Sequence, residues 1–304
     1  MSKFALLAAI LAAGSLWTLA RAQDRTKLPT YRASTGMVLV PVTVTDRHGK
    51  TIRGLRAEDF EVFDERLPQP VVSVSGVELP TSIVLVLDIS GSMRGTLSAF
   101  KDVVNAFLSG SNPEDEFSLL SVSSKPASIS GFTSDLEFIR DTVQLAGAGG
   151  GTALIDAIHL GLNEVRLARR SRTAMLILSD GMDNSSRYSR RELMREAMET
   201  NAQIYSMIID DGPATRKAGE MAEAQAGWQL LEGLAEMTGG LHFRVRGAAA
   251  ARDAAAKAGA AMRSAYVIGY RAPEMDGSGK WRRVKIKTEI PGAHVSARGG
   301  YFGQ

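Results

Sequence analysis

The sequence predicts an α/β fold in which a doubly wound, mostly parallel sheet is flanked by β-sandwich-like segments from both ends of the chain. The first observation is residues 83–87, an unbroken apolar run of mostly β-branched side chains, which is typical of a strand buried on both faces. Similar runs alternate with amphipathic helical patterns up to residue 264, as in sheets covered on both faces. Strand-like patterns without helices fill residues 37–77 and 265–298.

Strands and helices are expected to alternate in the central region. Strands are expected over 83–87, 117–122, a polar edge segment at 127–132, 176–178, 203–209 and 241–245. Helices are expected over 96–109, 134–145, from 152 onward, 189–200, 228–237 and the Ala-rich stretch 248–265. Ser134 with Glu137, and Ser189 with Glu192, have the spacing of a capping box at two helix starts. Residues 211–227 are too long for a simple connection, so an inserted helical or mobile segment is expected there.

The two ends of the chain have β patterns of their own. About four short strands are expected before Pro80, and three more over 265–270, 281–288 and 294–298. Each set is too small to form a stable sheet alone, so one shared sandwich is expected, with the α/β domain inserted into it.

The amino-acid composition limits the classes of function that the chain can have. The chain has 304 residues, 44% hydrophobic, with 36 basic and 33 acidic residues and a formal net charge of +3. Because both charge signs are mixed throughout, nucleic-acid binding is not indicated. The chain has no cysteine, which excludes disulfides, thiolate metal sites and cysteine nucleophiles.

The N-terminus has the pattern of a secretory signal. Lys3 precedes an apolar stretch at residues 4–13, and Ala20-Arg21-Ala22 provides the small residues of a cleavage site. The mature chain is then expected to begin at Gln23, without a transmembrane segment, and to be secreted or periplasmic. The alternative is an uncleaved anchor, since residues 4–20 approach the lower limit for a span. The expected division is a signal peptide at 1–22, a β segment at 23–79, an α/β domain at 80–264 and a β segment at 265–304.

A polar loop follows the first buried strand. In Asp88-Ile89-Ser90-Gly91-Ser92 a carboxylate and two hydroxyls alternate, so one backbone turn can point all three the same way. Only hard oxygen ligands are offered, which suits Mg²⁺, Mn²⁺ or Ca²⁺ and argues against zinc or copper. The alternative is an Asx-type turn and helix cap without a metal.

This loop resembles the metal-ion-dependent adhesion site of von Willebrand factor type A domains, which also has a Thr on a second loop and an Asp on a third. Residues 149–157 contain the matching Gly-Gly-Thr with Thr152, and residues 176–181 contain a strand that ends in Asp180-Gly. The resemblance implies a Rossmann-like domain whose metal site is formed by Asp88, Ser90, Ser92, Thr152 and Asp180. Residues 54–62 also resemble a segment of a bacterial VWFA-related family, first noted for acidobacterial proteins, whose label implies no activity.

The same resemblance implies a function and the roles of the site residues. Ser90, Ser92 and Thr152 are expected to touch the metal directly, and Asp88 and Asp180 to hold it largely through waters. The metal then captures an Asp or Glu of another protein, so the chain is expected to be a binding module and not an enzyme. Asp183 and Asn184 are candidates for a supporting layer around the metal, or simply turn residues.

Other chemistry fits the sequence less well. A phosphate-binding loop at residues 147–152 lacks the required Lys. An enzyme with Asp88 as an aspartyl nucleophile would need a second Asp at the position of Ser90. A serine nucleophile would need a Gly-x-Ser-x-Gly elbow and a partner His, and His159 is expected to be a packed or solvated helical residue. Two alternatives stay open: a divalent-metal phosphohydrolase using Asp88 and Asp180, and a structural protein with an inactive site.

Overall fold

The computed structural model describes residues 36–76, 78–210, 217–273 and 279–303. The predicted signal peptide and its anchor alternative lie outside these residues. All the described residues belong to one compact unit of the chain. Among the described residues, no helix combines the length and apolar character that crossing a membrane requires.

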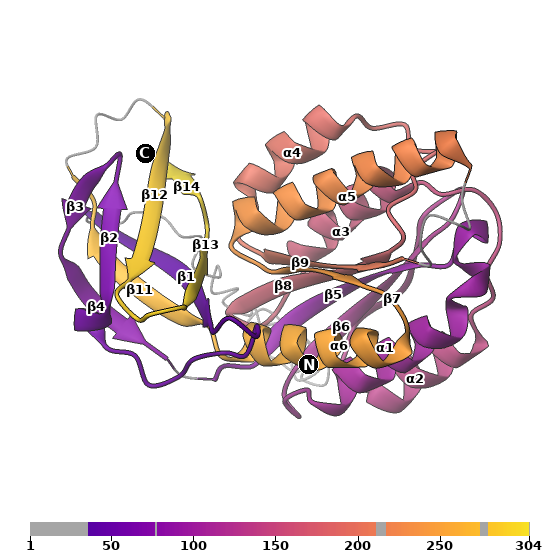
Figure 1. Ribbon diagram of the computed structural model, residues 1–304, viewed down its shortest axis with the longest axis horizontal. Coiled ribbons are helices and arrows are strands. Elements are labelled where there is room, and N and C mark those ends of the chain that lie inside the picture. The colour runs from indigo at the N-terminus through magenta and orange to yellow at the C-terminus, as the bar shows by residue number, and fades with distance from the viewer. Residues whose placement is uncertain (1–35, 77, 211–216, 274–278, 304) are drawn as a thin grey trace, which may run out of the picture. The chain divides into compact units, whose positions relative to one another are not determined.

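A six-stranded sheet forms the centre of the fold, in the order β10-β9-β8-β5-β6-β7 (Figure 1). Its strands are β5 (Thr81–Asp88), β6 (Glu116–Val122), β7 (Ala127–Thr133), β8 (Arg172–Ser179), β9 (Gln203–Ile209) and β10 (His242–Val245). All neighbours pair in parallel except β6 and β7, which are antiparallel, with β7 at the edge. The predicted mostly parallel sheet is therefore confirmed.

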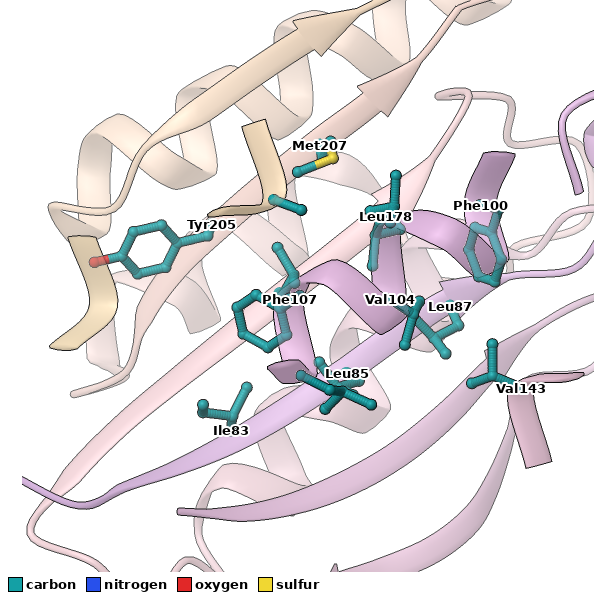
Figure 2. Packing of buried hydrophobic residues seen from close by; sticks show 14 of the residues in the cluster. Ile83, Leu85, Leu87, Phe100, Val104, Phe107, Val143, Leu178, Tyr205 and Met207 are labelled. Atoms are coloured by element: carbon teal, nitrogen blue, oxygen red, sulfur yellow. The ribbon is translucent and has the colours of Figure 1, made fainter. Parts of the chain in front are cut away.

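Helices cover both faces of this sheet, with α3, α4 and α5 on one side and α1, α2 and α6 on the other (Figure 1). They are α1 (Leu97–Ser109), α2 (Leu136–Leu145), α3 (Leu154–Val165), α4 (Arg190–Glu199), α5 (Ala218–Thr238) and α6 (Ala248–Arg263). Side chains of β5 alternate between the two cores, because successive residues of a strand point to opposite faces. Ile83, Leu85 and Leu87 belong to the same core as residues of α1 (Figure 2) and α6, whereas Val84 and Val86 belong to the core that includes residues of α3 and α5.

Two details of the helices differ from the sequence prediction. Asp135, not Ser134, is the N-cap of α2, since its Oδ1 accepts from the N–H of Phe138 at 2.9 Å while Ser134 Oγ donates to the carbonyl of Asp115. The helix expected over 228–237 is the second half of α5, which already begins at Ala218. The first part of the expected insertion, residues 211–216, lies outside the described residues. The capping box of Ser189 and Glu192 is present as predicted.

The two chain ends form two antiparallel sheets, in the orders β13-β1-β11-β4 and β14-β12-β2-β3. The N-terminal strands are β1 (Met37–Thr45), β2 (Phe60–Asp64), β3 (Leu67–Gln69) and β4 (Val71–Ser75), and the C-terminal ones are β11 (Tyr266–Arg271), β12 (Trp281–Thr288), β13 (His294–Ala297) and β14 (Gly300–Phe302). In each sheet a strand from one end pairs with a strand from the other, β1 with β11 and β2 with β12. The flanking β segments of the predicted fold class are confirmed.

Arginines at the ends of elements connect the sheets to the helices. Arg298 follows β13 and donates to the carbonyls of Met198 and Thr200 at the C-terminus of α4. Arg172, at the start of β8, donates to the carbonyls of Met262 and Arg263 at the end of α6. Positive charge at the C-terminal end of a helix stabilises it, so these contacts attach the C-terminal ends of α4 and α6 to β13 and β8.

Candidate metal centre

The five residues expected to form a metal site are on loops at one edge of the central sheet. Asp88 is the last residue of β5, and Asp180 follows the last residue of β8. These strands are parallel neighbours with Leu87 opposite Leu178, so both carboxylates leave the sheet at its C-terminal edge. Thr152 precedes α3 and completes the group. Ligand sites of open α/β sheets commonly lie at this edge.

The loop after β5 turns sharply around the Asp88 carboxylate. Its Oδ1 accepts from the N–H of Ser90 at 2.9 Å, which is the Asx-type turn that the sequence offered as an alternative to a metal. The helix cap of that alternative is absent within the described residues, because Ser90 makes no side-chain capping bond to the short 3-10 helix Gly91–Gly95. Instead, Ser90 Oγ lies 3.0 Å from Ser92 Oγ. Asp88 and Ser90 are fully buried, whereas Ser92 is exposed.

The glycine loop is bonded directly to the loop after β5. The N–H of Gly149 donates to the carbonyl of Ile89 at 2.9 Å, and the N–H of Gly91 donates to the carbonyl of Gly150 at 3.0 Å. Gly150 has φ of +78°, and a Cβ on Gly91 would meet the Gly150 carbonyl oxygen at 3.0 Å. These glycines let the two backbones approach each other, which brings Thr152 to the loop of Asp88.

Thr152 is held through its backbone. Its N–H donates to Asn184 Oδ1 at 2.9 Å, and its carbonyl accepts from the N–H groups of Asn184 and Ser185. The side chain is 2% exposed, and its hydroxyl makes no hydrogen bond with another described residue. Asp183 Oδ1 accepts from the N–H of Leu154 at 2.9 Å, at the start of α3. Asp183 and Asn184 therefore position the Thr152 loop, a role more specific than the supporting layer or turn expected from sequence.

The two carboxylates influence each other electrostatically. Burial, followed by the negative charge of Asp180, raises the pKa of Asp88 to about 6, while hydrogen bonds from Ser179 and Ser90 act in the opposite direction. Ser179 Oγ donates to Asp88 Oδ2 at 2.6 Å and accepts from the N–H of Gly181 at 3.0 Å. Sequence reasoning missed Ser179, although its place directly before Asp180 at a strand end was a usable signal.

Trp228 of α5 is a second contributor that sequence reasoning missed. Its indole N–H donates to the carbonyl of Asp180 at 2.7 Å. Gly181 has φ of +87° and a Cβ there would lie 2.5 Å from Trp228, while a Cβ on Gly227 would lie 1.8 Å from the Gly181 carbonyl oxygen. Helix α5 thus packs directly onto the Asp180 loop. No local pattern announces this contact, because it joins residues far apart in sequence.

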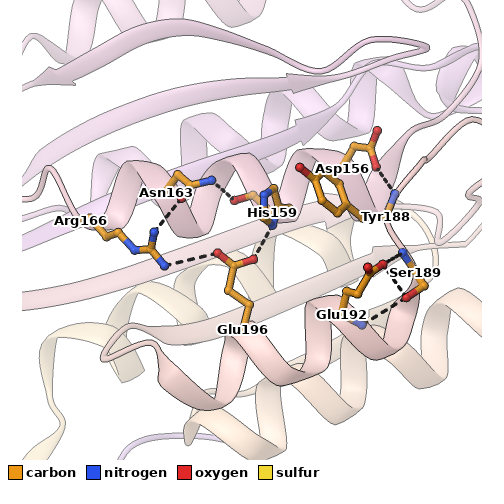
Figure 3. Close-up of polar contacts among 8 residues, drawn as sticks. All are labelled: Asp156, His159, Asn163, Arg166, Tyr188, Ser189, Glu192 and Glu196. Atoms are coloured by element: carbon orange, nitrogen blue, oxygen red, sulfur yellow. Dashed lines mark hydrogen bonds and ion pairs between the residues drawn. The ribbon is translucent and has the colours of Figure 1, made fainter.

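A polar network between α3 and α4 fixes the end of the same loop (Figure 3). Asp156 Oδ1 accepts from the N–H groups of Arg187 and Tyr188 at 2.8 and 3.0 Å. His159 stacks on Tyr188 with ring centroids 4.0 Å apart and contacts Glu196 through Nδ1. His159 is thus a packed helical residue, and the network ties residues 180–189 to two helices.

The donor set fits a hard divalent cation. In the described part of the chain, no three His, Cys, Asp or Glu side chains converge on a common point, so a site built on such ligands alone is not present there. The candidate centre instead offers two buried carboxylates and the hydroxyls of Ser90, Ser92 and Thr152. Oxygen ligands of this kind suit Mg²⁺, Mn²⁺ or Ca²⁺, and a cation would balance the two carboxylates.

Comparison with known proteins identifies the domain that carries these loops. Residues 83–183 match the family model of the von Willebrand factor type A domain, which spans β5 to the Asp180 loop. The chain contains a von Willebrand factor type A domain. The resemblance predicted from Asp88, Thr152 and Asp180 is therefore confirmed at the level of the domain.

Several proteins are similar to the chain that carries this type A domain. A von Willebrand factor type A structure from Catenulispora acidiphila has a TM-score of 0.51 at 14% identity, over 90% of this chain and 75% of that one. BatB from Bacteroides thetaiotaomicron has a TM-score of 0.48 at 17% identity, over 60% and 98%. An uncharacterized protein of Borreliella burgdorferi is 27% identical over 137 residues, 42% of this chain and 40% of that protein, so the match spans two fifths of that relative. The structural likenesses concern the fold alone.

Proposed function

We propose that the type A domain is a metal-dependent protein-binding module that captures a carboxylate of a partner protein. The observation that supports this function is a pair of buried carboxylates, Asp88 and Asp180. The nearby Ser90 hydroxyl makes no helix-capping hydrogen bond. A group at least nine-tenths buried and next to a like charge is unfavourable unless a counter-charge is added. We take that counter-charge to be Mg²⁺, with Mn²⁺ or Ca²⁺ as alternatives.

Each site residue has a proposed role. Ser90, Ser92 and Thr152 hold the ion directly, and Asp88 and Asp180 hold it largely through waters. A divalent cation with mostly neutral direct ligands supplies an electrophilic position for an Asp or Glu of the partner. The exposed side chain of Ser92 marks the side from which a partner reaches the centre.

We propose binding in preference to catalysis. His159 is engaged by Glu196 and Tyr188, and Ser90 occupies the position where an aspartyl-phosphate enzyme requires a second Asp. A raised pKa on a buried acid is nonetheless typical of active sites, so the phosphohydrolase alternative deserves one direct test. Hydrolysis of p-nitrophenyl phosphate in Mg²⁺ that disappears in Asp88→Ala would favour it over binding.

Export is part of the proposal. The chain is secreted or periplasmic after removal of residues 1–22, as the signal pattern indicates. Mass spectrometry of the exported protein should find Gln23 at the N-terminus; a chain that retains Met1 and sediments with membranes would indicate an anchor.

The binding function is tested in two steps. Calorimetric titration with Mg²⁺ should show one site in the wild type and none in Asp88→Ala, with the exposed Asp253→Ala as a matched control. Pull-down from envelope extract should then recover a partner in Mg²⁺ and lose it in EDTA or in Asp88→Ala. Equal recovery with and without the chelator would contradict the metal-bridged mechanism.

A further inference from the structure

Two arginines lie at the same edge of the sheet as the candidate metal centre. Arg244 is in β10 and Arg246 directly follows it, while Asp210 directly follows the neighbouring strand β9. The Nη2 atoms of Arg244 and Arg246 lie 2.9 and 3.3 Å from Asp210 Oδ2. Asp210 is 2% exposed, whereas the arginine side chains are 47% and 64% exposed. Both guanidinium groups are therefore held by a buried carboxylate, while much of each arginine side chain is exposed to solvent.

Arg244 is joined to the metal centre through one side chain. Its guanidinium carbon lies 3.6 Å from the ring centroid of Trp228, and the indole N–H of Trp228 donates to the carbonyl of Asp180 at 2.7 Å. Stacking on an aromatic face and bonding to a buried carboxylate both restrict the guanidinium. A restricted arginine loses less entropy when it binds a further anion than a free surface side chain does.

The charges of this cluster do not cancel. Among Asp210, Arg244 and Arg246, one carboxylate faces two guanidinium groups, so the three side chains carry a net positive charge. Each guanidinium contacts Asp210 through Nη2, and its planar fork has further N–H donors that can bind a carboxylate. If the arginines only neutralised Asp210, one would suffice.

The sheet order gives the spacing between the two positions. Asp180 follows β8, which is separated from β10 by β9 alone, and Asp88 ends β5 on the other side of β8. With neighbouring strands about 4.8 Å apart, the end of β10 lies about 10 to 14 Å along the edge from the ends of β8 and β5, which carry Asp180 and Asp88. An extended peptide advances about 3.3 Å per residue, so this distance corresponds to about three or four residues.

We propose that Arg244 and Arg246 form a second, anion-binding contact for the same partner. The partner segment is then an extended acidic stretch whose first Asp or Glu binds at the metal centre and whose second, three or four residues away, binds the arginine pair. This inference rests on the proposed metal-dependent function and specifies the partner that it recognises.

The test uses capped peptides of Gly and Ser that carry either one Glu or two Glu separated by three residues. Calorimetry with the full chain in Mg²⁺ should show about tenfold tighter binding of the two-Glu peptide, the gain expected from an added charge-assisted contact. R244Q/R246Q should lose this preference and keep its affinity for the one-Glu peptide within about twofold. The matched control is R166Q/R169Q, which removes two exposed arginines that contact the largely buried Glu196 and Glu116.

The outcomes separate the two proposals. A preference that survives in R244Q/R246Q, with binding still dependent on Mg²⁺, overturns the arginine contact and leaves the metal function intact. Arginine-dependent binding of the two-Glu peptide that persists in EDTA overturns the metal function and supports the contact, and no binding of either peptide overturns both. If the double variant fails to fold, R246Q alone decides, since Arg246 is the more exposed of the two.

Discussion

Two fully buried carboxylates in this protein have opposite surroundings. Asp64, in the β-sandwich, accepts from Arg282 Nε and Nη2 at 3.0 and 2.8 Å and from the hydroxyls of Tyr270 and Tyr301 at 3.0 and 2.8 Å. Asp88, in the type A domain, accepts from the N–H of Ser90 and the hydroxyl of Ser179, and has Asp180 nearby.

The difference separates a structural carboxylate from the one that we propose to bind a metal. Asp64 bonds to side chains of β11, β12 and β14, so its charge is compensated by the chain and joins strands of both sheets. No basic side chain is among the main influences on the pKa of Asp88, and the negative charge of Asp180 acts on it. Burial is equal in both cases, so the two carboxylates differ in their counter-charge and not in their exposure.

The largest effect is expected from Asp64→Asn. This change leaves the guanidinium of Arg282, whose side chain is 20% exposed, without its counter-charge, and should destabilise the fold by about 3 to 5 kcal/mol. Urea denaturation measures it, with the exposed Asp253→Asn as a control that should stay within about 0.5 kcal/mol of the wild type. A loss below about 1 kcal/mol would remove Asp64 from the comparison as a structural anchor.

Asp88→Asn is expected to have the opposite sign in the absence of metal. The folded pKa of Asp88 is raised from 3.8 to about 6, so folding disfavours its carboxylate form. Stability from this group is complete below about pH 4 and is lost as the pH rises through about 6. At pH 7 the neutral amide should therefore stabilise the metal-free protein by up to about 3 kcal/mol.

Urea denaturation in EDTA at pH 7 and at pH 4 checks this prediction. The gain from Asp88→Asn should be present at pH 7 and largely disappear at pH 4, which is close to the unfolded pKa of 3.8 and well below the folded pKa of about 6. Added Mg²⁺ should raise the stability of the wild type and leave Asp88→Asn unchanged. Destabilisation by Asp88→Asn at pH 7 in EDTA would place Asp88 with Asp64, as a residue that the fold needs charged.

Thr152→Val addresses the hydroxyl of the second loop. The substitution keeps the shape of the side chain, and the Thr152 hydroxyl makes no hydrogen bond with another described residue, so metal-free stability should change by less than about 0.5 kcal/mol. Mg²⁺ affinity should fall about tenfold, which is about 1.4 kcal/mol, if the hydroxyl is a direct ligand. Thr152→Ser retains the hydroxyl and should retain the affinity. Equal Mg²⁺ affinity in all three proteins would contradict the ligand role.

Much of this architecture could be predicted from local patterns. The apolar run of β5 indicates a strand buried on both faces, and the periodicity of α1 indicates a helix buried along one stripe. The Ala-rich sequence of α6 indicates a helix through its high helix propensity, and each of these signals is visible within a few residues. The loops of Asp88, Thr152 and Asp180 could be found because each directly follows a strand or precedes a helix. Asp135 was missed as a cap because Ser134 and Asp135 are both suitable, and only the contact of Ser134 with Asp115 decides between them.

The supporting contacts could not be predicted in the same way. Asp64 and Tyr301 are 237 residues apart in sequence, and Trp228 and Asp180 are 48 apart. Nothing in the local sequence of either partner fixes which side chain arrives from the other element. The short strand β14 was also missed, since three residues give too little alternation to detect.

A smaller effect than that of Asp64→Asn is expected from Tyr301→Phe, which removes one of several donors from Asp64. Its loss at neutral pH should be about 1 to 2 kcal/mol, because Arg282 and Tyr270 still satisfy the carboxylate. Burial, with the hydrogen bond to Asp64 and its charge, raises the pKa of Tyr301 to about 12 from 10. The stability that this phenol contributes is therefore present below pH 10 and is lost as the pH rises towards 12. The wild type should lose more stability than Tyr301→Phe between these values, in urea denaturation followed by circular dichroism, and Mg²⁺ should not alter the difference. Equal losses would show that the phenolic proton of Tyr301 does not contribute to the compensation of Asp64, and that Arg282 and Tyr270 without it distinguish this carboxylate from Asp88.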